Sequence, residues 1–100
     1  MTVSEKFASC ISIIMPAWNA AQMIEESIAS VLAQDDEGWE LLIVDDGSDD
    51  ATAAIASAAA SSDARIRLLS HPESRGPAAA RNTAIEAARG RYIAFLDADD

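Results

Sequence analysis

The sequence predicts an α/β protein with a doubly wound, mostly parallel sheet in three α/β/α layers. Two observations predict it. Apolar strand-like runs alternate with helix-like segments in the order β-α-β-α-β-α-β, and the connections between them are short. Such alternation favours parallel strands joined by helices that cover both faces of the sheet. A chain of 100 residues has room for one small domain.

Four apolar runs have the length and composition of strands. Residues 11–15 are largely β-branched and are stopped by Pro16. Residues 41–44 are continuously apolar, as is typical of a central parallel strand covered on both faces. Residues 65–69 partly alternate charged and apolar side chains, which indicates a half-exposed edge strand. Residues 92–96 predict the last strand.

Three segments between these runs predict helices. Residues 20–34 place their apolar side chains on one helical face, and Asn19 just before them is a good N-cap. Residues 51–60 are rich in alanine, which favours a helix but buries little area. Pro77 suits the first turn of the third helix, and Gly90 suits the position just after its end.

Composition excludes several classes of partner and location. The formal net charge of −10 repels nucleic-acid phosphates and anionic lipids. The single cysteine, Cys10, cannot form an internal disulfide. Residues 1–9 predict an irregular lead-in without signal-peptide character, and 10–100 predict the domain. With no apolar run of about 18 residues, we expect a cytoplasmic protein, or one at the cytoplasmic face of a membrane if the full protein is longer.

Acidic side chains follow two of the predicted strands. In a doubly wound sheet, the turns after parallel strands open on one edge, where ligands bind. Residues 16–19 are expected to form the floor of that crevice. Clustered carboxylates repel one another unless a cation offsets them, and Mg²⁺ or Mn²⁺ suits carboxylate and phosphate oxygens. The acids concerned are Asp45, Asp46, Asp97, Asp99 and Asp100.

Four segments in this order resemble family 2 glycosyltransferases of the GT-A fold, a Rossmann-like nucleotide-diphospho-sugar transferase fold. They are ISIIMPAWN (11–19), LLIVDDGSDD (41–50), GPAAARNTA (76–84) and GRYIAFLDADD (90–100). The resemblance implies an inverting enzyme that binds a nucleoside-diphosphate sugar, with a UDP-sugar expected, through Mn²⁺ or Mg²⁺. It also implies transfer to a glycan or lipid-linked acceptor, and family breadth suggests bacterial surface polysaccharide synthesis.

The resemblance also implies roles for the residues after the first two strands. Asp46 matches the carboxylate that accepts a hydrogen bond from the uracil ring N–H; a guanine base also offers ring donors. Asp45 belongs to the same nucleotide-binding set, or it holds the loop, since Asp-Gly-Ser is also ordinary turn chemistry. Trp18 and Asn19 match an aromatic–Asn pair, which with Pro16 and Ala17 forms the nucleotide-binding loop. Trp18 either stacks on the base or packs under that loop.

In the DxD motif, the resemblance makes Asp99 the metal ligand and Asp97 the ribose contact. Residues two apart in an extended segment face the same side, so both carboxylates can address one ligand. Arg81 matches the family's Ala-Arg-Asn and either approaches the diphosphate or pairs with Asp45 or Asp97. His71, the only histidine, lies where the family often has Asn, and we expect it to be incidental.

The resemblance places the catalytic base downstream of residue 100, so no catalytic residue is assigned. We expect a piece of a longer enzyme that is inactive alone and self-associates through the open sheet edge of its last strand. One alternative is a non-catalytic nucleotide-binding module. A phosphohydrolase or phosphoreceiver is disfavoured because Lys6 is the only lysine. A Rossmann oxidoreductase is disfavoured because Gly-x-Gly-x-x-Gly is missing after the first strand.

Overall fold

One parallel sheet organises the chain. The structure is a computed structural model that describes residues 11–34 and 38–98. All three strand pairings are parallel, and the strand order is β3-β2-β1-β4. The predicted α/β class with a parallel sheet is therefore confirmed. The strands are β1 (Ile11–Ala17), β2 (Trp39–Asp46), β3 (Ile66–His71) and β4 (Tyr92–Phe95).

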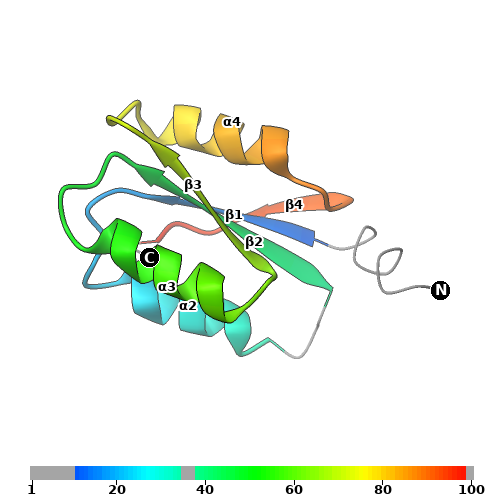
Figure 1. Cartoon of the computed structure of the whole chain (residues 1–100). Helices are drawn as coiled ribbons and strands as arrows, with labels where there is room; N and C mark the ends of the chain where they lie inside the picture. Colours follow the sequence, from blue (N-terminus) through cyan, green and yellow to red (C-terminus); the bar gives the residue numbers. More distant parts are fainter. Residues whose placement is uncertain (1–10, 35–37, 99–100) are drawn as a thin grey trace.

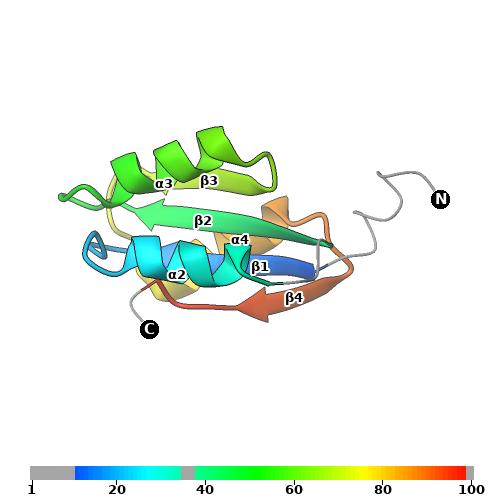
Figure 2. The same cartoon turned by 90° about the horizontal axis from the view of Figure 1, so that it is seen from below.

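Helices cover both faces of this sheet. Helices α2 (Ile24–Leu32) and α3 (Thr52–Ser62) lie on one face, and α4 (Pro77–Ala87) lies on the other (Figures 1 and 2). Because side chains alternate along a strand, β2 serves two separate cores. Leu41 and Ile43 belong to the core under α2 and α3, whereas Leu42 packs with the alanines of α4. The three predicted layers are therefore present.

The first helix begins later than predicted. It starts at Ile24 with Met23 in the N-cap position, so the prediction that Asn19 caps it was wrong. Asn19 instead has a positive φ of 46°, and its side-chain oxygen accepts a hydrogen bond from the Asp49 backbone N–H at 2.9 Å. Asn tolerates this left-handed conformation better than most residues. Asn19 therefore stabilises a loop conformation and does not cap a helix.

The outer strands of the described sheet are β3 and β4. The prediction that residues 65–69 form an edge strand is confirmed. In β4, Tyr92, Ile93 and Phe95 are exposed, and self-association through this edge stays a prediction. Among the described residues, no helix has the length and apolarity required to cross a membrane. The lead-in predicted for 1–9 lies outside the described residues.

Candidate functional site

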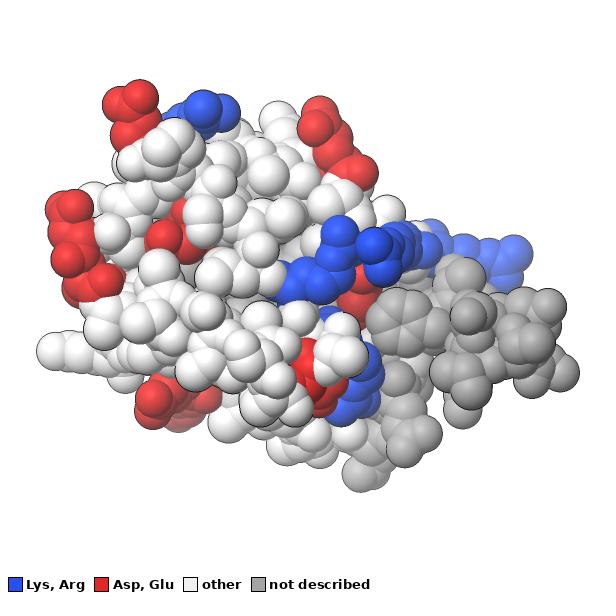
Figure 3. All heavy atoms as spheres, viewed as in Figure 1, with Lys and Arg blue, Asp and Glu red and all other residues white. Residues whose placement is uncertain are grey.

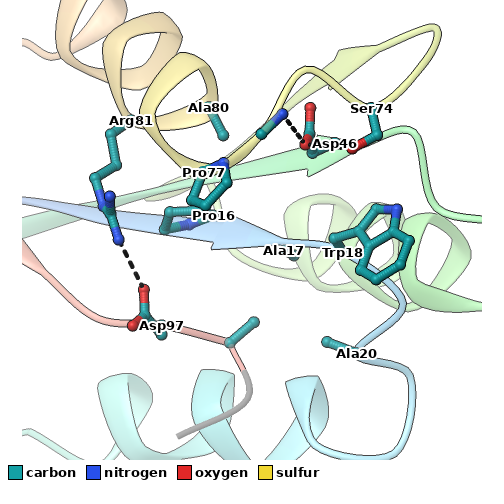
Figure 4. Close-up of a pocket in the computed structure, with 12 residues that line it drawn as sticks. Pro16, Ala17, Trp18, Ala20, Asp46, Ser74, Pro77, Ala80, Arg81 and Asp97 are labelled. Atoms are coloured by element: carbon teal, nitrogen blue, oxygen red, sulfur yellow. Dashed lines mark hydrogen bonds and ion pairs between the residues drawn. The ribbon is translucent and has the colours of Figure 1, made fainter.

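A pocket opens where the carboxyl ends of the strands meet. It lies next to β1, where the strand order reverses between β2 and β4, the position at which open α/β sheets bind ligands. Its volume of about 360 Å³ suits a small-molecule ligand. The pocket is lined by Pro16, Ala17, Trp18, Ala20, Asp46, Ser74, Gly76, Pro77, Ala80, Arg81, Asp97 and Ala98 (Figure 4).

The loops after β1 and β2 are tied to each other by reciprocal hydrogen bonds. The Asn19 backbone N–H donates to Ser48 Oγ at 3.0 Å, and the Asp49 N–H donates to Asn19 Oδ1 at 2.9 Å. Trp18, directly before Asn19, is 58% exposed and forms part of the pocket wall. Its ring is therefore open to a ligand, and the alternative in which Trp18 packs under the loop does not hold.

The Asp46 carboxylate is the centre of a buried network at one end of the pocket. Oδ1 lies 2.7 Å from His71 Nδ1 and accepts the Arg75 backbone N–H at 2.9 Å. Oδ2 accepts Ser74 Oγ–H at 3.0 Å and the Gly76 backbone N–H at 2.9 Å. A carboxylate offers roughly four lone-pair sites, so all of them are occupied by the segment 71–76.

These hydrogen bonds also decide the charge of Asp46. Burial alone would raise its pKa, but the donors from Arg75, His71, Gly76 and Ser74 outweigh burial and lower the pKa to about 2. The group is thus an anion at neutral pH and can only accept hydrogen bonds. The direct contact with a base N–H, which the resemblance implied for Asp46, stays a prediction, and it requires one of the four present donors to leave.

His71 is not incidental, so that expectation was wrong. It is the last residue of β3, stands directly opposite Asp46 in the strand register, and is buried. Because an ionised carboxylate cannot donate, His71 Nδ1 carries the hydrogen that it shares with Asp46. Its other nitrogen, Nε2, lies 2.8 Å from Thr83 Oγ1 on α4. Only the β2–β3 register places His71 here, and nothing in the local sequence shows it.

The segment 73–76 can reach Asp46 because position 47 is a glycine. Gly47 has a φ of +71°, and an added Cβ would lie 2.5 Å from the Ser74 nitrogen and 2.6 Å from the Glu73 carbonyl carbon. The two loops therefore meet backbone to backbone. A side chain at position 47 would push the Ser74 segment away from the carboxylate, so the glycine shapes the site without contacting a ligand.

Asp45 lies on the opposite side of the sheet from Asp46, as strand alternation requires. It is buried, its Oδ1 accepts the Ser48 backbone N–H at 3.2 Å, and it is not among the residues that line the pocket. The geometry matches the loop-holding alternative. The grouping of Asp45 with the nucleotide-binding residues therefore finds no support in its position.

Asp97 reaches the pocket because the chain continues beside β1 after β4 ends. The Leu96 N–H donates to the Ile14 carbonyl at 3.0 Å, and the Ala98 N–H lies 3.4 Å from the Pro16 carbonyl oxygen. Arg81 Nη2 is 3.8 Å from Asp97 Oδ1, with the two side chains 39% and 43% exposed. Such a long, exposed ion pair contributes little to stability. Both groups are therefore free to take a ligand.

Of the two aspartates to which the DxD motif assigns a role, Asp97 and Asp99, the structure describes only Asp97. Within 11–34 and 38–98, no group of three His, Cys, Asp or Glu residues is arranged to hold a metal ion. The accessible Asp97 carboxylate is a hard oxygen ligand of the kind that Mg²⁺ and Mn²⁺ take. Asp99, the predicted metal ligand, lies outside the described residues with Asp100.

Fold and pocket together define an α/β ligand-binding domain. An exposed aromatic ring, a buried carboxylate and an accessible Arg–Asp pair line one crevice at the switch point. The model of the glycosyl transferase family 2 matches residues 12–100. The chain therefore belongs to this family, as the sequence motifs indicated.

Named relatives agree with this assignment. Over 90 residues, the chain is 51% identical to the UDP-Glc:alpha-D-GlcNAc-diphosphoundecaprenol beta-1,3-glucosyltransferase WfgD of Escherichia coli. It is 47% identical over 90 residues to the putative teichuronic acid biosynthesis glycosyltransferase TuaG of Bacillus subtilis. Each match covers 90% of this chain but only 35% and 36% of the relatives. The chain thus spans about a third of their length.

Solved structures share the fold. A crystal structure of residues 1–349 of TarS from S. aureus superposes with a TM-score of 0.84 at 30% identity, covering 91% of this chain and 28% of that piece of TarS. The mannosyltransferase PcManGT of Pyrobaculum calidifontis, in complex with GDP-Man and Mn²⁺, gives a TM-score of 0.82 at 32% identity. That match covers 89% of this chain and 27% of PcManGT. The chain therefore has the fold of the matched portion of these two proteins.

Proposed function

We propose that this chain is the nucleotide-sugar-binding part of an inverting, metal-dependent glycosyltransferase, with a UDP-sugar as donor. The observation that carries the proposal is one pocket lined by residues from four different elements. Asp46 ends β2, Arg81 lies in α4, and Trp18 and Asp97 come after β1 and β4. Relatives support it: the name of WfgD specifies a UDP-glucose donor, TarS has been crystallised with UDP, and PcManGT with GDP-Man and Mn²⁺.

The pocket has two ends that suit the two ends of a nucleoside diphosphate. Trp18 offers a ring face for the base, and base–aromatic stacking contributes about 1–3 kcal/mol. Pro16 and Ala17 form the floor between the ends. Asp97 suits a ribose hydroxyl, and Arg81 suits a phosphate because its planar guanidinium donates several hydrogen bonds. Asn19 acts on this site through the loop that presents Trp18.

The distribution of charged side chains favours a site that binds its ligand together with a cation. Acidic side chains stand along the carboxyl-end rim of the visible face, whereas most basic ones lie towards the amino ends of the strands (Figure 3). A diphosphate approaching this rim meets like charge, and the chain carries a net charge of −10. We assign Asp99 as the ligand of Mn²⁺ or Mg²⁺, and the metal, when bound, would stabilise the leaving diphosphate.

The reaction that we propose is a single displacement. An acceptor hydroxyl forms a bond to the sugar C1 as the bond to the diphosphate breaks, so that the anomeric configuration inverts. The acceptor is a glycan or lipid-linked sugar, as the diphosphoundecaprenol in the name of WfgD suggests, and the setting is bacterial surface polysaccharide synthesis. The base that takes the hydroxyl proton is expected in sequence beyond residue 100.

Nucleotide titration tests the proposal. The dissociation constant for UDP is measured by calorimetry with Mn²⁺ and with EDTA, for the wild type and for Asp99→Asn, Asp97→Asn and the exposed-helix control Glu26→Gln. We expect Mn²⁺ to tighten binding by about 10-fold or more, since it neutralises charge at the diphosphate. Asp99→Asn should remove that gain and Glu26→Gln should leave it. Binding that is equally tight in EDTA would refute the metal-dependent mode.

A further inference from the structure

We propose that Ser27 of α2 is a positioning residue for the DxD segment, because its hydroxyl fixes the backbone between Asp97 and Asp99. Ser27 Oγ donates a hydrogen bond to the Ala98 carbonyl oxygen at 2.8 Å, although the two residues are 71 positions apart. Ser27 itself is not among the residues that line the pocket. The inference rests on the proposed function and adds to it a residue that acts from outside the pocket.

Ser27 occupies a position of α2 where the helix pattern favours an apolar side chain. The buried residues of this helix are Ile24, Ser27, Ile28 and Val31, and the serine is the only polar one among them. A serine within a helix commonly turns its hydroxyl to solvent or to the carbonyl four residues earlier. Ser27 is only 6% exposed, and its hydroxyl bonds the distant Ala98 carbonyl instead. The serine is therefore explained by its partner and not by the helix.

Ala98 is held at three points. Its N–H lies 3.4 Å from the Pro16 carbonyl oxygen, its carbonyl accepts the Ser27 hydroxyl, and its methyl group packs in the core under α2 and α3. These contacts hold the chain on the side of α2. The Asp97 side chain is 43% exposed and points the other way, towards Arg81 across the pocket (Figure 4). The anchoring of Ala98 thus sets which way its neighbour faces.

The anchor lies beyond the last regular strand pairing. Strand β4 ends at Phe95, two residues before Asp97, so the sheet alone does not fix the DxD backbone. Without the Ser27 hydroxyl, the Ala98 carbonyl loses this hydrogen bond, and the peptide that joins residues 98 and 99 becomes freer to turn. Groups that hold metal ligands in place matter for affinity, since their loss commonly weakens metal binding by about 10–100-fold. Ser27 should therefore act on metal-dependent binding without touching the ligand.

Metal-dependent UDP binding tests this proposal. The dissociation constant for UDP is measured by calorimetry with Mn²⁺ and with EDTA, and the ratio of the two values gives the metal-dependent gain. Electron paramagnetic resonance, which detects free Mn²⁺, gives the Mn²⁺ affinity in the presence of UDP. The variants are Ser27→Ala, Ser27→Cys, Ser27→Thr and Ser30→Ala.

Each variant has a separate purpose. Ser27→Ala removes the hydroxyl. Ser27→Cys keeps the size of the side chain but offers only a weak S–H donor, so it repeats the loss in case Ser27→Ala fails to fold. Ser27→Thr returns a hydroxyl. Ser30→Ala is the matched control, because the Ser30 hydroxyl donates to the Ser27 carbonyl within the same helix at 2.7 Å.

We expect the wild type, Ser27→Thr and Ser30→Ala to show a metal-dependent gain of about 10-fold or more. Ser27→Ala and Ser27→Cys should reduce the gain to about 2-fold and weaken Mn²⁺ by about 10-fold, with a smaller change of UDP affinity in EDTA. If both keep the full gain, or weaken UDP equally with Mn²⁺ and with EDTA, the inference is wrong while the proposed function stands. If the wild type itself shows no gain, the proposed metal-dependent function fails, and the inference fails with it.

Discussion

Two buried carboxylates on the same strand and the same face of the sheet have different uses. Glu40 and Asp46 lie six positions apart near the two ends of β2, and they are 1% and 3% exposed. In both, burial would raise the pKa and hydrogen bonds outweigh it, so that the pKa of each is lowered. By burial, charge and pKa alone, the two groups are alike.

Their hydrogen-bond donors differ in origin. Glu40 Oε2 accepts Ser12 Oγ–H and the Arg89 N–H, each at 2.6 Å, and Oε1 accepts Arg67 Nη1–H at 3.2 Å. These donors come from β1, β3 and the connection between α4 and β4, so Glu40 fastens separate elements together. All donors to Asp46 come from the single segment 71–76, which borders the pocket.

The comparison teaches that a shifted pKa does not by itself mark a functional carboxylate, since structural networks shift pKa values too. What separates the two is location. Asp46 stands at the carboxyl end of its strand, beside a pocket, and holds a loop; Glu40 stands at the amino end and does not line that pocket. Substitution of Glu40 should therefore lower stability without changing ligand affinity, whereas substitutions around Asp46 should also affect ligand binding.

The largest expected effect is on stability at the amino end. Glu40→Ala leaves the Arg67 guanidinium, the Ser12 hydroxyl and the Arg89 N–H without their shared acceptor. A buried donor left without its acceptor costs about 1–3 kcal/mol, and the Arg67 side chain, although 27% exposed, loses its ion pair as well, so we expect the free energy of unfolding to fall by about 3–5 kcal/mol. Urea denaturation followed by circular dichroism measures this, with exposed Glu86→Ala as control. The UDP affinity of the remaining folded protein should be unchanged; a weakened affinity would contradict the separation of the two sites.

Gly47→Ala should lower both stability and binding. The substitution forces a side chain into a left-handed conformation and against the Glu73 and Ser74 backbone, which together lower the free energy of unfolding by about 3 kcal/mol. Gly76→Ala is the matched control, because Gly76 also has a positive φ but an added Cβ meets no atom within 4 Å. We expect Gly47→Ala to be the more destabilising in thermal denaturation and to weaken UDP binding in titrations. Equal effects would show that the loop contact is unimportant.

Acid should weaken the Asp46 network. The pKa of Asp46 is lowered to about 2 from 3.8, so its stabilisation is fully present above pH 3.8 and is lost as the pH falls through 2. The shift corresponds to about 2 kcal/mol. Urea denaturation between pH 5 and pH 2 should therefore show a smaller loss for Asp46→Asn than for the wild type. Parallel curves for the two proteins would contradict the assignment of an ionised Asp46.

The strands and the gathering of site residues at one sheet edge could be predicted from the sequence, because both follow from the alternation of strands and helices. Apolar runs such as 41–44 mark the strands, and residues after parallel strands gather at one edge. That rule predicts that Trp18, Asp46 and Asp97 share one crevice, and in the structure all three line one pocket. Strand alternation also separates Asp45 from Asp46, a consequence that the grouping of both as ligand-binding residues overlooked.

The parts that were missed depend on long-range register and loop conformation. His71 meets Asp46 only because β2 and β3 pair as they do. Ser74 reaches Asp46 only because Gly47 admits the backbone of the next loop. Neither residue carries a local signal, since a serine and a histidine in a polar loop are ordinary. The prediction that Asn19 caps a helix failed for a related reason, because asparagine suits both a helix cap and a left-handed loop position.

The smallest expected effect on stability, paired with a clear effect on binding, is at Trp18. Because its ring is 58% exposed, Trp18→Ala should change the free energy of unfolding by less than about 0.5 kcal/mol. Loss of stacking should nevertheless weaken UDP by about 10-fold. The chain has two tryptophans, Trp18 and Trp39. Trp39 is buried, and the Arg65 guanidinium carbon lies 3.9 Å from the centre of the Trp39 ring. Trp39→Phe therefore leaves Trp18 as the only tryptophan, and UDP should quench its fluorescence. Fluorescence that does not respond to bound UDP would place the base elsewhere than at Trp18.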